Sequence, residues 1–144
     1  MRSDLIANAA ISIAADKNKV WQALVTPDAI KQYMFGAEVE TDWRVGSEIT
    51  WSGEFNGKHY EDKGKILRLE PKRTLCYSHY SPMSGKPDKP KNYHTVTIQL
   101  AENGDTTRVS LMQDKNADAK SKAESEQNWK VILRGLKHCV EATS

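Results

Sequence analysis

The chain has 144 residues, which is enough for one domain with a proper hydrophobic core. Its 21 Lys and Arg residues and 19 Asp and Glu residues are interspersed and leave a net charge of only +2, which argues against a dedicated nucleic-acid binder. No apolar run approaches the length of a membrane span and the first residues lack a signal-peptide core, so we expect a cytoplasmic protein.

The first third of the chain predicts a strand followed by two short helices. Apolar alternation favours a strand over residues 6–14. Asp16 is placed to cap the first helix, and Pro27 opens the second because proline fits the first turn of a helix. The first helix has one apolar face, formed by Val20, Trp21, Leu24 and Val25.

The middle of the chain is typical of a meander of strands joined by turns. Asn56-Gly57 is the strongest hairpin signal, and its return strand contains Gly64, which predicts a bulge or a strong bend. A loop is expected over 81–92, which holds three of the five prolines. The predicted strands cover residues 37–41, 47–55, 58–69, 74–80, 93–100 and 106–113.

The end of the chain predicts one long helix over residues 118–141. Its apolar stripe consists of Trp129, Ile132, Leu133, Leu136 and Val140. The first half of this helix is polar, and we expect it to project over solvent or over the rim of a cavity. No repeat or composition shift divides the sequence, so residues 1–144 are interpreted as a single domain.

A series of short motifs occurs in order along the chain. They are Val20-Trp21-x-Ala23-Leu24, Thr26-Pro27, Val45-Gly46-Ser47, Gly64-x-Ile66, Glu70-Pro71-x-x-Thr74-Leu75, Thr107-Arg108-Val109 and Trp129. Taken together, this ordered set resembles the START-related helix-grip superfamily, which includes the polyketide cyclase-like proteins. Within it, the chain is most similar to the group of homologues of the activator of the ninety-kilodalton heat-shock chaperone's ATPase.

This resemblance implies an α+β helix-grip fold. Such a fold has a curved seven-stranded antiparallel sheet wrapped around a long C-terminal helix, with two short helices near the N-terminus. It also implies a hydrophobic cavity, which binds small apolar or amphipathic molecules in many members. Two features depart from the family pattern: Ser47 replaces a frequent second glycine, and Tyr33-Met34-Phe35 replaces a stretch that commonly carries tryptophan.

The candidate lining of this cavity is a set of inward-facing side chains that are aromatic or form hydrogen bonds. They are Trp51, Phe55, Tyr77, His79, Gln113 and Trp129. His79 can anchor a ligand, shuttle a proton or serve as a hydrogen-bonded structural residue. Gln113 can orient a ligand carbonyl or bond to His79. Asp62 would face inward beside Trp51 only in a regular strand, and the irregularity expected at Gly64 argues against that.

The sequence predicts no catalytic, cofactor-binding or metal-ligating residues. Cys76-x-x-His79 is half of a metal-ligand pattern, and strand alternation places these two side chains on opposite faces. The sequence contains no phosphate-binding glycine loop or dinucleotide fingerprint. Lys86, Lys89 and Lys91 are interpreted as solvated charge in the 81–92 loop.

Three functions remain open. The leading interpretation is a binding module for an unidentified hydrophobic or amphipathic small molecule. The first alternative is a polyketide cyclase or aromatase-like enzyme that uses the same cavity. The second is a co-chaperone-like protein with a chaperone or other protein partner, against which the expected single domain argues because chaperone activators carry a second one.

Overall fold

The computed structural model describes residues 5–142, except for the side chains of Phe55 and Met83. The α+β class, the seven strands, the two short helices and the long C-terminal helix are all as expected from the sequence. The elements in chain order are β1 (Ala7–Ile13), α1 (Lys17–Val25), α2 (Pro27–Tyr33), β2 (Glu38–Thr41), β3 (Glu48–Phe55), β4 (Lys58–Glu70), β5 (Thr74–His79), η2 (Pro82–Ser84), η3 (Pro90–Asn92), β6 (His94–Asn103), β7 (Thr106–Gln113) and α3 (Ala119–Ala142).

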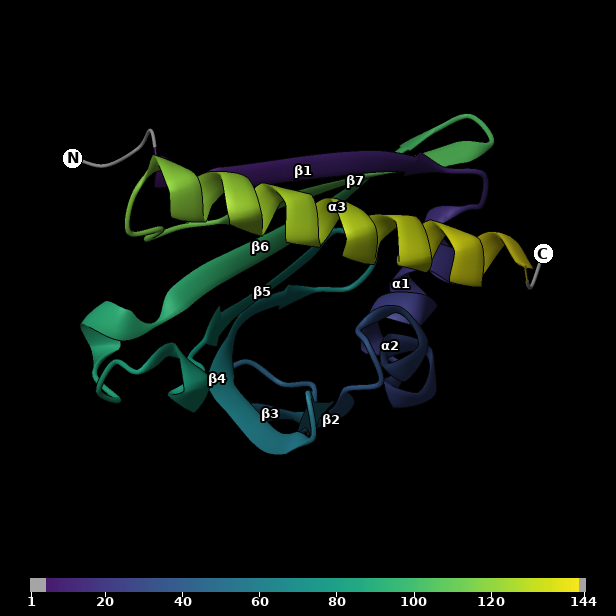
Figure 1. The fold of residues 1–144 in the computed structure, drawn as a ribbon. Helices are drawn as coiled ribbons and strands as arrows, with labels where there is room; N and C mark the ends of the chain where they lie inside the picture. The colour runs from purple at the N-terminus through teal and green to yellow at the C-terminus, as the bar shows by residue number, and fades with distance from the viewer. Residues whose placement is uncertain (1–4, 143–144) are drawn as a thin grey trace.

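The strands form one antiparallel sheet in the order β1-β7-β6-β5-β4-β3-β2. The first strand therefore pairs with the last one, and the rest follow as a meander. Figure 1 shows the sheet curving around α3, with α1 and α2 near the C-terminal end of that helix. This curvature leaves the concave face of the sheet turned toward α3.

The apolar stripe of α3 is the face that the sheet covers. All five predicted stripe residues are buried: Trp129, Ile132, Leu133, Leu136 and Val140. They belong to one hydrophobic cluster with buried strand residues such as Ile66, Val96 and Leu111. The opposite face of α3 is mostly polar. None of the described helices is long and apolar enough to cross a membrane.

The structure also confirms two local predictions, the start of the first helix at Asp16 and the hairpin turn at Asn56-Gly57. The side chain of Asp16 accepts a hydrogen bond from the Lys19 amide at 2.9 Å and so caps α1. Asn56 and Gly57 have φ values of 53° and 78°, as a two-residue turn between β3 and β4 requires. This turn pairs Phe55 with Lys58 and sets the register of the hairpin.

Gly64 does not mark the bulge of β4. The register shift lies between Ile66 and Arg68, on the side of Gly64 that is farther from the hairpin turn. Gly64 is instead needed because β5 approaches it closely: a Cβ atom at this position would lie 1.7 Å from the Ser78 carbonyl oxygen. The Ser78 hydroxyl accepts a hydrogen bond from the Lys65 amide at 2.9 Å, which holds the two strands at this separation.

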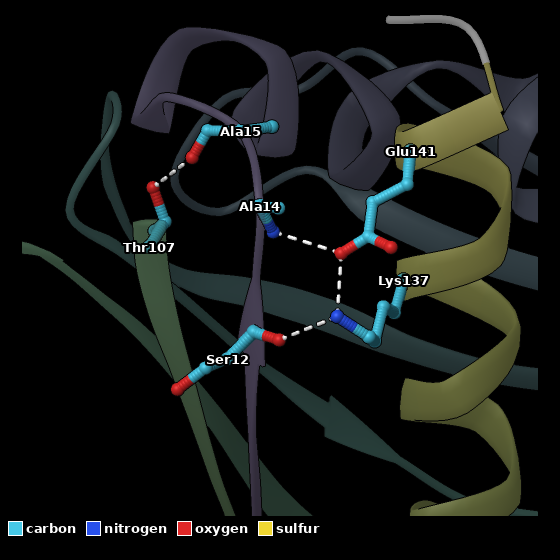
Figure 2. Close-up of polar contacts among 6 residues, drawn as sticks. All are labelled: Ser12, Ala14, Ala15, Thr107, Lys137 and Glu141. Atoms are coloured by element: carbon cyan, nitrogen blue, oxygen red, sulfur yellow. Dashed lines mark hydrogen bonds and ion pairs between the residues drawn. The ribbon is translucent and has the colours of Figure 1, made fainter. Parts of the chain in front are cut away.

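The C-terminal end of α3 is bonded to the outer edge of β1. The Ala14 amide donates a hydrogen bond to the Glu141 carboxylate at 2.8 Å, and Lys137 Nζ donates to the Ser12 carbonyl at 3.0 Å (Figure 2). Lys137 and Glu141 also form an ion pair one helical turn apart. The bond from Ala14, followed by the contact with Lys137, lowers the pKa of the Glu141 carboxyl.

The N-terminal half of α3 contacts the same edge. The Glu126 carboxylate accepts a hydrogen bond from the Asn8 amide at 3.0 Å, so this half does more than project over solvent. Asp118 lies just before the helix and accepts a hydrogen bond from the Ser121 amide at 2.8 Å. Side chains along most of α3 therefore satisfy backbone groups that no strand covers.

Candidate functional site

A pocket of about 390 Å³ lies between the concave face of the sheet and α3. Its wall contains five of the six side chains that the sequence singled out: Trp51, Tyr77, His79, Gln113 and Trp129. They come from β3, β5, β7 and α3, elements that are far apart in the chain. The sixth, Phe55, has a side chain outside the described part of the structure.

A smaller space of about 30 Å³ adjoins the pocket and is almost entirely apolar. The two share the side chains of Met34, Trp51, Tyr77, Trp129 and Ile132. The remaining lining of the smaller space comes from the hydrophobic core, including Leu75, Leu111 and Leu133. One side of the pocket thus leads toward the core, where hydrocarbon is favoured over water.

The other side of the pocket carries a paired histidine and carboxylate. His79 Nε2 lies 2.9 Å from Asp62 Oδ2, and the two side chains are 30% and 17% exposed. Asp62 faces inward, contrary to the expectation from Gly64, because β3 and β4 pair without a shift along the whole hairpin. That pairing sets Asp62 directly opposite Trp51.

Aromatic rings line the pocket beside this pair. The Trp51 ring lies 5.1 Å from the His79 ring in an edge-on arrangement and 5.0 Å from the Tyr77 ring. Burial raises the pKa of the Tyr77 phenol, which therefore stays protonated at neutral pH.

Within the described residues, Asp62 Oδ1 is buried without a hydrogen-bond partner. A buried acceptor left in this state costs stability, and such groups are often retained for function.

Gln113 bonds to the helix and not to His79. Its Oε1 accepts a hydrogen bond from Trp129 Nε1 at 2.6 Å, while its Nε2 lies 3.4 Å from the Ser125 hydroxyl. The same hydroxyl donates to Asn116 Oδ1 at 2.9 Å. This network ties the end of β7 to α3 and fixes the Trp129 ring in the pocket wall.

The family model described as "Activator of Hsp90 ATPase homolog 1-like protein" matches residues 14–141. The chain belongs to this family. The matched region includes every strand after β1 and nearly all of α3. It therefore contains the whole set of pocket residues described above.

Solved structures agree with this assignment to the Hsp90 ATPase activator homologues. A solution structure of ChR145 from Cytophaga hutchinsonii is 49% identical, covers 96% of this chain and 94% of its own, and has a TM-score of 0.84. The Aha1 dimer from Colwellia psychrerythraea is 26% identical, with coverages of 94% and 96% and a TM-score of 0.72. CalU16 from Micromonospora echinospora is also 26% identical, with coverages of 92% and 74% and a TM-score of 0.71. No curated protein matches the chain.

In this member of the family, several pocket residues were missed by the sequence analysis. One of them had a usable signal: the two-residue turn at Asn56-Gly57 fixes the pairing of Phe55 with Lys58, and counting back along the hairpin brings Asp62 opposite Trp51. The others had no such signal, because they depend on how distant elements pack. They include Met34, Phe35, His94, Ser125 and Asn128.

Proposed function

We propose that this protein binds a small apolar or amphipathic molecule in the pocket between the sheet and α3. The observation that carries the proposal is the division of the pocket wall. Trp51, Trp129 and Ile132 supply apolar surface, while Asp62 and His79 form a polar pair within the same pocket. A mostly apolar hollow with a few placed polar groups is typical of small-molecule sites.

The wall of the pocket is held in place before any ligand arrives. Gln113 fixes the indole of Trp129, and the Trp51 ring packs against Tyr77 and His79. Side chains that are already ordered lose little conformational entropy when a ligand binds. In this proposal the apolar part of the ligand contacts the two tryptophans, and His79 or the Tyr77 hydroxyl forms a hydrogen bond that orients it.

Blocking the pocket tests this proposal. Asn128 is exposed on α3 and lies on the pocket wall, so Asn128→Trp places a large ring in the opening without removing a core residue. We expect the variant to bind the uncharged probe 1-decanol at least tenfold more weakly than the unmodified protein. Isothermal titration calorimetry measures the two dissociation constants.

Gln127→Trp is the matched control. Gln127 is the adjacent exposed residue of the same helix and does not line the pocket. The control adds the same ring elsewhere and is expected to keep the affinity of the unmodified protein. Equal affinities for 1-decanol in both tryptophan variants would place binding elsewhere and contradict the proposal.

The His79–Asp62 pair favours one second candidate, an enzyme of the polyketide cyclase kind. In a neutral imidazole whose Nε2–H donates to a carboxylate, the other ring nitrogen is free to accept a proton. Such a base beside a bound carbonyl compound would remove a proton from the carbon next to the carbonyl.

His79→Gln separates the two functions, because glutamine keeps a hydrogen-bonding group and removes the base. With 2-decanone as probe, we expect the variant to bind within about tenfold of the unmodified protein, since one neutral hydrogen bond contributes about 0.5–1.5 kcal/mol. We also expect neither protein to accelerate exchange of the ketone's α-protons with D₂O, followed by NMR. Acceleration that disappears in the variant while binding persists would establish the enzyme in place of the binding module.

A further inference from the structure

A second pocket, of about 100 Å³, adjoins the first and is strongly basic. The two pockets share His79, Ser81 and His94. The rest of the second pocket's lining is polar and consists of Ser84, Lys86, Lys91, Asn92 and Lys115. Three of these five residues are lysines. A molecule in the first pocket therefore has a positively charged space directly beside it.

Among the described residues, no carboxylate lines this basic pocket or forms an ion pair with its lysines. The carboxylates of the surrounding segments have other partners. Asp88, in the same loop, pairs with Lys63, and hydrogen bonds from Lys63 and Tyr93 lower the pKa of Asp88. Asp114 accepts a hydrogen bond from the Thr95 amide at 2.6 Å. The loop's own acid thus neutralises a lysine outside the pocket.

The backbone that carries these lysines is tied down. The Tyr80 hydroxyl donates a hydrogen bond to the Lys86 carbonyl at 2.6 Å, and the Tyr80 ring stacks on Tyr93 at 5.2 Å. The Asn92 side chain donates to the Pro87 carbonyl at 2.8 Å. The 81–92 segment is therefore a folded loop that holds the backbone of its lysines in a defined place.

Lys115 completes the group from a different part of the chain. It follows β7 with a φ of 57°, and its Nζ lies 3.5 Å from the Pro90 carbonyl oxygen. Three lysines thus line one small space. Positive charges brought close together repel one another, and an anion between them turns that repulsion into attraction. The sequence predicted only solvated charge in the loop and did not predict that Lys115 lines the same pocket as Lys86 and Lys91.

We propose that the basic pocket binds the anionic head of an amphipathic ligand whose hydrocarbon part occupies the first pocket. The inference rests on the proposed function and narrows its ligand class to hydrocarbon chains that end in a carboxylate or a phosphate. His79, which lines both pockets, lies at the junction between chain and head. Ammonium groups recognise either anion as point charges, so the two head groups are distinguished by experiment.

The test compares three probes with the same chain: decanoate, decyl phosphate and 1-decanol. By calorimetry at low salt, the unmodified protein is expected to bind one or both anions at least tenfold more tightly than the alcohol. The triple variant Lys86→Gln, Lys91→Gln and Lys115→Gln is expected to bind all three probes alike, within about threefold. Added salt is expected to weaken the binding of decanoate and decyl phosphate and to leave the binding of 1-decanol unchanged, because salt screens exposed charges.

Lys58→Gln, Lys65→Gln and Lys89→Gln together form the matched control. This variant loses the same charge from exposed positions that line neither pocket, one of them in the same loop. It is expected to keep the preference for anions. Equal affinity of the unmodified protein for decanoate, decyl phosphate and decanol, or equal loss of preference in both triple variants, overturns the head-group inference and leaves the apolar pocket standing. Failure of all three probes to bind the folded protein overturns the proposed function as well.

Discussion

Gly64→Ala is expected to destabilise the protein by about 3 kcal/mol, at the upper end of what overpacking costs. The added methyl group would lie 1.7 Å from the Ser78 carbonyl oxygen. That oxygen belongs to the backbone of β5, so the clash is relieved only if β4 and β5 move apart. Chemical denaturation followed by circular dichroism measures the change in the free energy of unfolding.

Gly53→Ala provides the comparison on the neighbouring strand. A Cβ at Gly53 would lie 3.1 Å from the Tyr60 hydroxyl and 3.2 Å from its ring, and this half-buried side chain at the pocket wall is able to shift by a few tenths of an ångström. We expect a loss below about 1 kcal/mol, as for an ordinary strand position. Equal midpoints for Gly64→Ala and the unmodified protein would show that β5 does not approach β4 this closely.

Leu133→Ala is expected to lower the free energy of unfolding by about 2–5 kcal/mol, the range for truncating a buried leucine. Leu133 is 3% exposed in the middle of the α3 stripe and also lines the small apolar space. Its removal takes away contacts with both the sheet and the neighbouring helix residues. Urea denaturation gives the difference directly.

Val131→Ala tests the opposite face of the same helix. Val131 is 43% exposed, and alanine has a higher helix propensity than valine, so the change is expected to stay within about 0.5 kcal/mol. A loss below about 1 kcal/mol for Leu133→Ala, or similar losses for both variants, would mean that this stripe is not the core face of α3.

The elements that the sequence predicted well depend on short-range chemistry. The Asp16 cap, the Pro27 helix start and the Asn56-Gly57 turn each involve residues within a few positions of one another. The stripe of α3 needs only helical periodicity. Such signals predict the type of an element and its inner face. The arrangement of the helices and strands in space was predicted from the resemblance to the helix-grip superfamily.

The site depends on relations that no local signal fixes. Asp62 and His79 meet because the isolated bridge between Lys63 and Tyr80 has the same register as the pair of Ile66 with Tyr77. The register shift comes only after Ile66, whereas the sequence suggested Gly64 for that irregularity. Gln113 was correctly placed on the inner face, but its hydrogen bond to Trp129 depends on where α3 crosses β7. Lys115 joins the loop lysines only through the path of the chain after β7. Alternation gives the face of a residue but not its partner.

The bonds between α3 and the outer edge of β1 also bear on how copies of this protein can meet. An uncovered edge strand is a template on which another chain can add a strand and extend the sheet into an aggregate. Along β1, the carboxylates of Glu126 and Glu141 already occupy two of the outward amides, those of Asn8 and of Ala14 just beyond the strand. The far edge is β2, only four residues long and carrying exposed Glu38 and Glu40. The two capped amides and the short, acidic far edge therefore disfavour sheet-to-sheet polymerisation.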